Sequence, residues 1–512
     1  MFMNRNFLCL LGLCLLFLVN GLSQSASDNI EFIILQMNDV YEISPLEGGK
    51  AGGLARVATL KKELLQENPN TIAVLSGDFL SPSLMTNLEM ENGEQIAGLQ
   101  MVETLNALGL DYVTFGNHEF DLSDPDLLQK RIDQSAFRYT VCNALRVKDG
   151  VTVPFTQQID GKDVPVPEYI IHEFSNEAGQ KVRLGLLGVV LPFNKQDYLQ
   201  YKDVTTTFRD SYHRLKQESD VVVGITHLAI DEDIQLAKDV PGIPLFLGGH
   251  DHHNMSHYVE NTIITKADAN AKTVYIHRIT YNPASGMTRI QSTLKTIDER
   301  IADDPVTQKV VTKWDDQLNA SMNGMGYDPK EALMTTNEVL VVTEAKVRTQ
   351  QTNFGHLTTQ AMEAMLPGAD VYVLNSGGMR LDDNIVGVIT QFDILRTFPF
   401  GGSIVTQEIP GTILQQVLEN GLNENQGEGG YLQVNYAAKM QGKWLIKGQP
   451  LEAGKTYKIV LPEFLASGLE QNLDMLGEFP MDKAAQFSLS GKMVRNDIRD
   501  VVMAYMREFG EE

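Results

Sequence analysis

Side chains that commonly bind metal ions follow five apolar segments in the first half of the chain. In chain order they are Asp39, Asp78, Asn117, His118, His227, His250, Asp251 and His252. A pair of divalent cations about 3.5–4 Å apart needs a bridging carboxylate, oxygen and nitrogen ligands on both sides, and an open position for water and substrate. Carboxylate, amide and imidazole ligands together favour zinc, manganese, cobalt or iron over magnesium, which prefers oxygen throughout. The side-chain types therefore predict a site for two divalent metal ions.

The segments that precede these side chains have the pattern of buried strands. They are apolar over several consecutive positions and read EFIILQM, TIAVLS, DYVTF, VVVGIT and IPLFLGG. Residues 52–67, between the first two segments, repeat apolar side chains with a helical period. This alternation predicts a layered α/β domain, in which the carboxyl ends of the strands converge on one crevice. One such side chain is commonly a turn or core residue, but five in order make that explanation improbable.

The length of the chain predicts more than one domain. A chain of 512 residues exceeds what one hydrophobic core usually organises. We expect the layered α/β domain at residues 28–298 and a linker helix at 299–335, which includes a charged helical stretch interrupted by Pro305. Residues 336–512 mix helices, strands and glycine-rich turns, which predicts a smaller mixed α/β domain.

The net charge limits the partners of the protein. A formal charge of −24 argues against a nucleic acid polymer, because proteins that bind one need a broad basic face. Any anionic ligand is therefore expected to be small and to meet local positive charge.

The first residues have the composition of a secretory signal peptide. Arg5 precedes an apolar run at residues 7–19, and small polar residues follow, with cleavage expected after Ser23 or Ser25, so that residues 1–25 are removed. The run is too short for a convincing membrane span, and the polar C-terminus predicts no membrane anchor. We therefore expect an exported protein, periplasmic or extracellular. Cys142 is then the one cysteine of the mature chain, which excludes an intramolecular disulfide.

Several short blocks of the chain resemble the signatures of a known family. The blocks are NDVY, SGDFLSPS, GNHEFD, GITHLAIDED and GGHDHH. They resemble those of the calcineurin-like metallophosphatases, specifically the secreted 5'-nucleotidase family, and the resemblance covers nearly the whole mature chain. It implies a metallophosphatase domain, a sheet core flanked by helices, followed by the C-terminal substrate-binding domain of that family.

The resemblance also implies roles for the metal-binding side chains. Asp78 would bridge the two metal ions. Asn117, His227 and His250 would complete one metal site, and Asp39 and His252 the other. His118 and Asp121 would form a catalytic dyad, in which the carboxylate orients the imidazole and the imidazole stabilises charge on the phosphoryl group. The resemblance gives no defensible role to Glu119 or His253.

Tyr41 departs from the family pattern, which has histidine two residues after the first aspartate. The ordinary pKa of a phenol is near 10, so its deprotonation at neutral pH is costly without a strongly polarising metal. Three alternatives are open: Tyr41 is a metal ligand, it donates a hydrogen bond from outside the ligand set, or that metal site is weak. The second alternative is favoured.

The resemblance assigns substrate binding to the second domain. Arg348, Asn375 and Arg380 would bind the nucleotide, and Phe400 would stack on its base. These arginines would supply the local positive charge that the net charge lacks. A second base-stacking aromatic of the family falls at residues 469–472, where this chain has Leu-Glu-Gln-Asn. We therefore expect weakened or altered base recognition.

The expected activity is hydrolysis of the phosphate monoester of a small-molecule nucleotide, releasing nucleoside and phosphate. Two alternatives are open. The same metal centre could serve a phosphodiesterase or a nucleotide-sugar hydrolase. The changes at Tyr41 and Asn472 could also mark a non-catalytic protein that binds a nucleotide or a metal.

Overall fold

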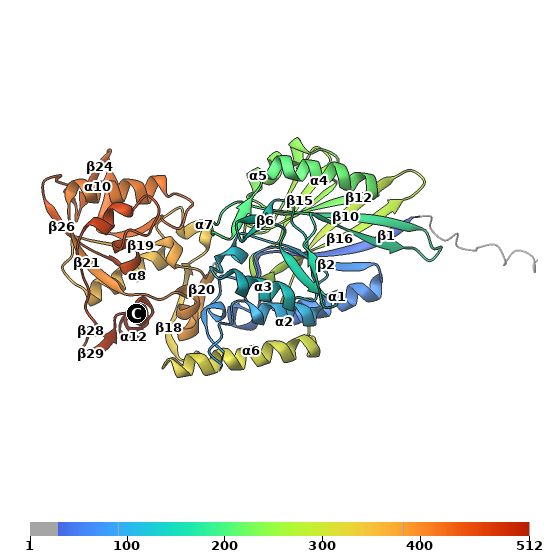
Figure 1. Cartoon of the computed structure of the whole chain (residues 1–512). Coiled ribbons are helices and arrows are strands. Elements are labelled where there is room, and N and C mark those ends of the chain that lie inside the picture. The colour runs from blue at the N-terminus through green and yellow to red at the C-terminus, as the bar shows by residue number, and fades with distance from the viewer. Residues whose placement is uncertain (1–28, 91, 382, 511–512) are drawn as a thin grey trace, which may run out of the picture.

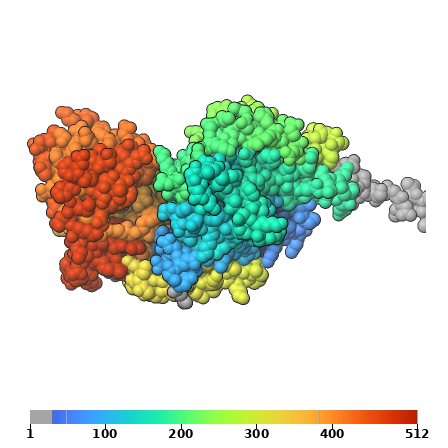
Figure 2. Space-filling view, in the orientation of Figure 1, coloured from blue at the N-terminus to red at the C-terminus, as the bar shows by residue number. Residues whose placement is uncertain are grey.

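The computed structural model describes residues 29–510 except 91 and 382, so the expected signal peptide lies outside the described residues. Figure 1 shows two bodies side by side, the first blue to green and the second orange to red, with the helix α6 below them. Figure 2 shows the same arrangement in space-filling form. Among the described residues, we find no helix that is both long enough and apolar enough to span a membrane.

Two mixed sheets form the centre of the first domain. One has the order β17 (Met287–Thr296), β16 (Thr273–Asn282), β1 (Ile30–Met37), β2 (Thr71–Ser76), β3 (Tyr112–Thr114) and β4 (Arg138–Tyr139). The other has the order β14 (Met255–Val259), β15 (Thr262–Lys266), β13 (Leu245–Gly248), β12 (Val221–His227), β10 (Lys181–Val190) and β9 (Tyr169–Ser175). Strands β1 to β4 are parallel to one another, as are β10, β12, β13 and β15.

The two sheets pack face to face and helices cover their outer sides. A buried apolar cluster joins side chains of both sheets, such as Phe32 and Ile34 from β1 with Leu184 and Leu186 from β10. The covering helices are α1 (Leu54–Glu67), α2 (Leu99–Leu108), α3 (Pro125–Gln134), α4 (Val204–Glu218) and α5 (Ile230–Asp239). The remaining strands of this domain are β5 (Ala144–Lys148), β6 (Val151–Val153), β7 (Thr156–Ile159), β8 (Lys162–Pro165) and β11 (Leu199–Tyr201). The predicted layered α/β fold is confirmed.

The second domain is a smaller mixed α/β unit, as predicted. Its main sheet has the order β22 (Leu432–Asn435), β19 (Val371–Asn375), β26 (Thr456–Pro462), β21 (Ile404–Pro410) and β27 (Met481–Asp482). Its other strands are β18 (Ala332–Val341), β20 (Asn384–Thr390), β23 (Ala437–Met440), β24 (Lys443–Ile446), β25 (Gln449–Pro450), β28 (Gln486–Leu489) and β29 (Lys492–Arg495). Its helices are α7 (Glu344–Val347), α8 (Asn353–Met365), α9 (Gln391–Thr397), α10 (Gly411–Glu419), α11 (Glu463–Ala466) and α12 (Ile498–Phe509).

The helix α6 (Pro305–Gly324) corrects one sequence prediction. Pro305 does not interrupt a helix but begins it, because proline is favoured at the first helical position. The Asp304 carboxylate caps this end by accepting a hydrogen bond from the backbone N–H of Thr307, at 3.0 Å. The helix ends at Gly324, before the end of the predicted linker at residue 335. It packs against α1 and α2 of the first domain through Trp314 and its neighbours.

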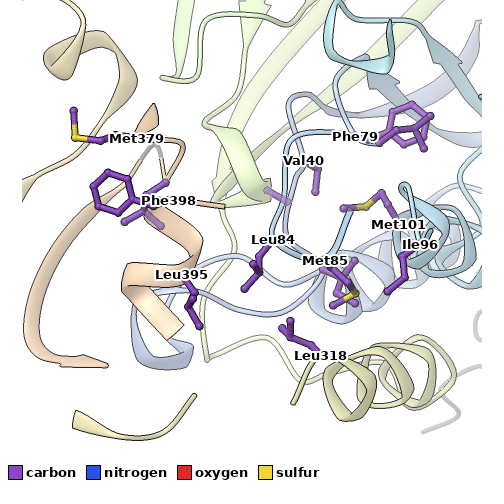
Figure 3. Close-up of a cluster of buried hydrophobic side chains, with 14 of the residues drawn as sticks. Val40, Phe79, Leu84, Met85, Ile96, Met101, Leu318, Met379, Leu395 and Phe398 are labelled. Carbon is purple, nitrogen blue, oxygen red and sulfur yellow. The ribbon is translucent and has the colours of Figure 1, made fainter. Parts of the chain in front are cut away.

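The apolar core continues from the first domain into the second. Figure 3 shows Leu84, Met85 and Leu318 near Leu395 and Phe398, and all five belong to one buried cluster. The two domains therefore share a packed apolar contact in this arrangement, which sets the position of the second domain over the strand ends of the first.

Candidate functional site

The carboxyl ends of strands from both sheets meet at one place in the first domain. Asp39 follows β1, Asp78 follows β2 and His227 ends β12. One ligand atom of each of these three side chains lies within 4.8 Å of the others, and all three residues are fully buried. The Nε2 atom of His227 is 3.1 Å from Oδ2 of Asp78 and 3.9 Å from Oδ1 of Asp39.

The other residues predicted as ligands lie around this group. The Oδ1 atom of Asn117 is 3.2 Å from Nε2 of His227. The rings of His250 and His227 have their centroids 5.5 Å apart, and the backbone N–H of His250 donates to Asp39 at 2.9 Å. Nε2 of His252 is 3.5 Å from Oδ1 of Asp39. The structure thus brings all six predicted ligands into one crevice.

Glycine residues next to these side chains allow this close approach. A Cβ atom at Gly116 would lie 2.1 Å from Oδ1 of Asp78, and one at Gly249 would lie 2.3 Å from the carbonyl oxygen of Ser76. Because both contacts are far too short for real atoms, only glycine fits at either position.

The electrostatics of the crevice are compatible with a bound cation. Burial alone would raise the pKa of Asp39 and Asp78, but the hydrogen bond of His252 to Asp39 and the charge of His227 beside both hold these pKa values low. Burial would lower the pKa of His227, yet the Asp78 carboxylate raises it to about 9. Two buried carboxylates thus attract positive charge. Burial lowers the pKa of His250 to about 4, so this imidazole is neutral at pH 7 and has a lone pair for a metal ion. Divalent cations would supply the required charge to a set of oxygen and nitrogen donors that suits them.

Tyr41 places its hydroxyl among the predicted ligands. The oxygen is 3.2 Å from Oδ2 of Asp78, 3.5 Å from Oδ1 of Asp39 and 3.0 Å from Nε2 of His252. Burial, followed by the charges of Asp78 and Asp39, raises the pKa of Tyr41 well above its usual value. The protonated phenol can donate to one of these carboxylates.

Glu119 has a structural role that the sequence did not indicate. Its buried carboxylate accepts hydrogen bonds from the backbone N–H groups of Gly116 at 2.6 Å, Asp78 at 2.9 Å, Phe79 at 2.7 Å and Leu80 at 3.1 Å. Burial and the nearby Asp78 raise its pKa to about 7. Glu119 therefore ties the loop after β2 to the loop after β3, which positions Asp78 and Asn117 relative to each other.

Lys266 supports the loop that carries His250 and His252. Its buried ammonium group is 2.6 Å from Oδ2 of Asp251, which lies between the two histidines, and 2.9 Å from Oδ2 of Asp233 in α5. It also donates to the carbonyl oxygen of Leu228 at 2.6 Å. This ammonium group fixes the loop to the sheet beneath it.

The predicted dyad forms beside the crevice. Nδ1 of His118 is 2.7 Å from Oδ2 of Asp121, and the backbone N–H of His118 donates to Oδ1 of Asp78 at 2.8 Å. Burial would lower the pKa of His118, but the charges of Asp121 and Asp78 raise it. Nε2 of His118 lies 3.3 Å from Nη2 of Arg380, which belongs to the second domain. The imidazole thus connects the first domain to an arginine of the second.

Asn194 is a further contributor that the sequence did not reveal. Its side-chain amide donates to the carbonyl oxygen of Asn117 at 2.6 Å and to Oδ1 of Asp121 at 3.0 Å. Asn194 is far from both partners in the sequence, so no local motif could have identified it. It holds the carboxylate of the dyad in place.

A cavity of about 500 Å³ opens beside the dyad, between the two domains. Its lining includes His118 and Asp121 from the first domain and Arg380 and Phe400 from the second, together with Phe193. The structure therefore places two of the four predicted substrate-binding residues, Arg380 and Phe400, at the dyad.

Arg348 and Asn375 are not among the residues that line this cavity. Each contacts a carboxylate of its own domain. Nη1 of Arg348 is 2.7 Å from Oε1 of Glu344, and the Asn375 amide donates to Oε2 of Glu470 at 3.0 Å. Burial would raise the pKa of Glu344, but the charges of Arg348 and Arg380, then those of His252 and His118, lower it. The Glu344 carboxylate therefore lies among the cationic groups of the site.

The segment at residues 469–472 makes polar contacts of its own. Leu469 is 68% exposed, and the Asn472 amide donates to Oδ1 of Asn425 at 2.8 Å. Glu470 is the partner of Asn375. No aromatic ring comes from this segment, as the sequence already showed.

Comparisons with known proteins agree with this arrangement. The family model for calcineurin-like phosphoesterase matches residues 32–254, and that for the 5'-nucleotidase C-terminal domain matches residues 332–478. The 5'-nucleotidase of Bos taurus is 24% identical over 506 residues, covering 86% of this chain and 83% of that protein. The trifunctional nucleotide phosphoesterase protein YfkN of Bacillus subtilis is 25% identical over 415 residues, which cover 74% of this chain but 27% of that protein.

A solved structure shows the same fold over almost the whole length. The crystal structure of the 5'-nucleotidase precursor from Thermus thermophilus aligns with a TM-score of 0.72 at 20% identity, covering 94% of this chain and 97% of that one. The likeness therefore includes both domains and the way in which one follows the other.

Proposed function

The chain belongs to the 5'-nucleotidase family, with a calcineurin-like phosphoesterase domain followed by a 5'-nucleotidase C-terminal domain, and from this premise we propose that it hydrolyses phosphate monoesters of nucleotides. It is a metal-dependent phosphoesterase, and the products are a nucleoside and phosphate. One observation carries the proposal most directly. The His118–Asp121 dyad and Arg380 of the second domain line one cavity of about 500 Å³, and the backbone N–H of His118 joins the dyad to the buried Asp78 carboxylate at 2.8 Å.

In this proposal the six side chains of the crevice would hold two divalent metal ions, and Asp78 would serve both. Asn117, His227 and His250 would bind one ion, and Asp39 and His252 would bind the other. When bound, such ions act as Lewis acids that stabilise charge on the attacking and leaving oxygens of an in-line displacement. The burial of Asp39, Asp78 and His227 supports this assignment, since two carboxylates buried side by side require positive charge close to them.

Tyr41 acts in this proposal as a protonated donor to a ligand carboxylate and not as a metal ligand. Its distance of 3.2 Å from Oδ2 of Asp78 and its raised pKa both support this role. A hydrogen bond to the carboxylate fixes the direction of the remaining lone pairs.

The dyad and Arg380 stabilise the charge that develops on the transferring group. Asp121 accepts from Nδ1 of His118 and, with Asp78, favours the imidazolium form, in which Nε2 also carries a proton that can bond the phosphoryl oxygens. Arg380 lies 3.3 Å from that atom and adds a second positive group. Preorganised donors of this kind contribute more in a partly dry cavity than in water. Phe400 supplies an apolar face for the nucleobase, and Arg348 and Asn375 bind the substrate once their carboxylate partners release them.

We also propose how the chain is divided and where it acts. The catalytic domain occupies residues 28–298, the linker 299–335 and the substrate domain 336–512. The chain leaves the first domain at the end of α6, and Tyr327 already donates to Asp500 of α12 at 3.0 Å. These contacts support a pivot between the domains at residues 325–326. Residues 1–25 direct export to the periplasm or the extracellular space.

A substrate screen on the purified protein tests this function. In manganese or zinc, phosphate should be released from AMP and from p-nitrophenyl phosphate, and cyclic AMP and UDP-glucose should be hydrolysed at least a hundredfold more slowly. Preferred hydrolysis of cyclic AMP or UDP-glucose would overturn the monoester assignment. A protein that binds metal and AMP but releases no phosphate from any of the four would overturn catalysis itself.

A further inference from the structure

Phe193 is an exposed aromatic residue of the first domain that faces the cavity beside the dyad. It lies in the loop between β10 and β11 and is 49% exposed. Phe400 lines the same cavity from the second domain and is 59% exposed. His118 and Arg380, which meet the phosphoryl group in the proposed function, line this cavity too.

Hydrogen bonds attach the loop of Phe193 to residues of the site, both before and after Phe193 in the sequence. Before it, the backbone N–H of Leu191 donates to the carbonyl oxygen of His227 at 2.8 Å. After it, Asn194 donates to Asp121 at 3.0 Å, and the Gln196 amide donates to the carbonyl oxygen of Phe120 at 3.0 Å. The position of Phe193 relative to the dyad is therefore fixed by hydrogen bonds.

A pair of exposed rings in one cavity suits a flat aromatic ligand. An exposed phenyl ring forms no hydrogen bonds with water through its faces that it would lose on binding. A nucleobase can stack on such a ring, and this stacking is favourable for each of the bases. The cavity volume of about 500 Å³ lies within the usual range for small-molecule sites. The segment Leu469 to Asn472 offers no ring that could act as the partner of Phe400.

We propose that Phe193 and Phe400 form a base clamp, in which the nucleobase of a nucleoside monophosphate stacks between one ring from each domain. This inference rests on the proposed function and adds a base-binding residue from the catalytic domain. Asn87 and Gln95 also line this cavity, and their side-chain amides would be able to bond the edge of the base. Because the two rings belong to different domains, the clamp exists only in the domain arrangement seen here.

Kinetics on substrates with and without a base test the clamp. Phe193→Leu should raise KM for AMP roughly tenfold with little change in kcat, and KM for ribose 5-phosphate should not change, because that ester has no base to stack. Phe193→Tyr keeps the ring and should retain the wild-type KM. Tyr258→Leu is the matched control, since Tyr258 is 77% exposed on β14 and does not line the cavity. Equal KM values for AMP in wild type and Phe193→Leu would overturn the clamp.

Adenosine binding separates the clamp from the proposed function. Titration calorimetry of the metal-loaded full chain should show roughly tenfold weaker adenosine binding for Phe193→Leu and for Phe400→Leu, and unchanged binding for Tyr258→Leu. An adenosine affinity that Phe193→Leu leaves unchanged overturns the clamp, whatever the enzyme hydrolyses. If wild type releases no phosphate from AMP but the adenosine result holds, the nucleotidase function is wrong and the base site stands.

Discussion

The Glu344 carboxylate lies among the cationic groups that are proposed to meet the substrate phosphate. It pairs with Arg348 at 2.7 Å, and its pKa is lowered by Arg348, Arg380, His252 and His118 despite burial. A substrate phosphate must therefore compete with a carboxylate that the protein itself supplies.

We predict that Glu344→Gln lowers KM for AMP about three- to tenfold and strengthens inhibition by inorganic phosphate by a similar factor. The physical reason is that the amide no longer neutralises the arginines. Initial-rate measurements with added phosphate give both constants. Glu408→Gln, at an exposed position of β21, serves as the control. An unchanged or raised KM for AMP in Glu344→Gln would contradict this role.

The dyad supplies a second prediction for single residues. His118→Ala should reduce kcat about a thousandfold with a small change in KM, since it removes a charge-stabilising donor at the reacting group. Asp121→Asn should cost less, about ten- to a hundredfold, because the imidazole remains and the amide oxygen can still accept from Nδ1, but the negative charge that favours the imidazolium form is lost. Steady-state kinetics on AMP provide the test, with circular dichroism to verify the fold. Wild-type kcat in either variant would remove the dyad from the mechanism.

For single residues, the sequence predicts the side chains at the ends of strands but not those that reach the site through tertiary contacts. Asp39, Asp78, Asn117, His227 and His250 could be identified because each lies at the end of an apolar strand or within three residues after it. Asn194, Phe193 and Glu344 could not, since each meets the site through tertiary contacts from a loop or helix with no motif of its own.

A buried histidine in the central strands of the first domain makes the stability of that domain sensitive to low pH. His277 of β16 is fully buried and lies 2.9 Å from Oε1 of Gln36 and 2.8 Å from the hydroxyl of Ser292. Gln36 Oε1 is an acceptor and the serine hydroxyl can donate, so this network suits the neutral imidazole. Burial lowers the pKa of His277 from 6.5 to about 3.

We predict that the burial of His277 lowers the free energy of unfolding of the protein as the pH falls. Below pH 6.5 the unfolded chain takes up a proton that the folded chain refuses until about pH 3, so the stability should fall by about 2 kcal/mol between pH 7.5 and pH 5. His277→Gln should lose that part of the pH dependence. Urea unfolding of both proteins at the two pH values measures it, and identical pH dependence would show that His277 does not contribute.

The ends of α6 show why element boundaries are harder to predict than elements. Pro305 fits the first turn of a helix as well as it fits a break, and only the cap from Asp304 and the packing of Trp314 on the first domain decide between them. The strands were easier to predict, because β1, β2 and β12 are buried along almost their whole length and are therefore continuously apolar.

For the whole molecule, the relation between the two domains determines the site. The sequence predicts two α/β units but not their relative placement, which depends on the shared apolar cluster and on contacts such as Lys272 with Asp383 at 3.1 Å. This placement brings Arg380 to His118, so a strongly acidic chain gains positive charge where a phosphate is expected. The catalytic domain alone would lack both Arg380 and Phe400.

Metal content and phosphate release, measured together on wild type and Asp78→Asn, test the central claim most directly. We predict two equivalents of divalent metal per wild-type chain, loss of AMP hydrolysis on chelation, and its return when metal is restored. Asp78→Asn should hold less than one equivalent and lose about a thousandfold or more in kcat, with its circular dichroism unchanged. Wild-type turnover by metal-free protein, or by Asp78→Asn, would contradict hydrolysis that depends on metal ions bound by Asp78.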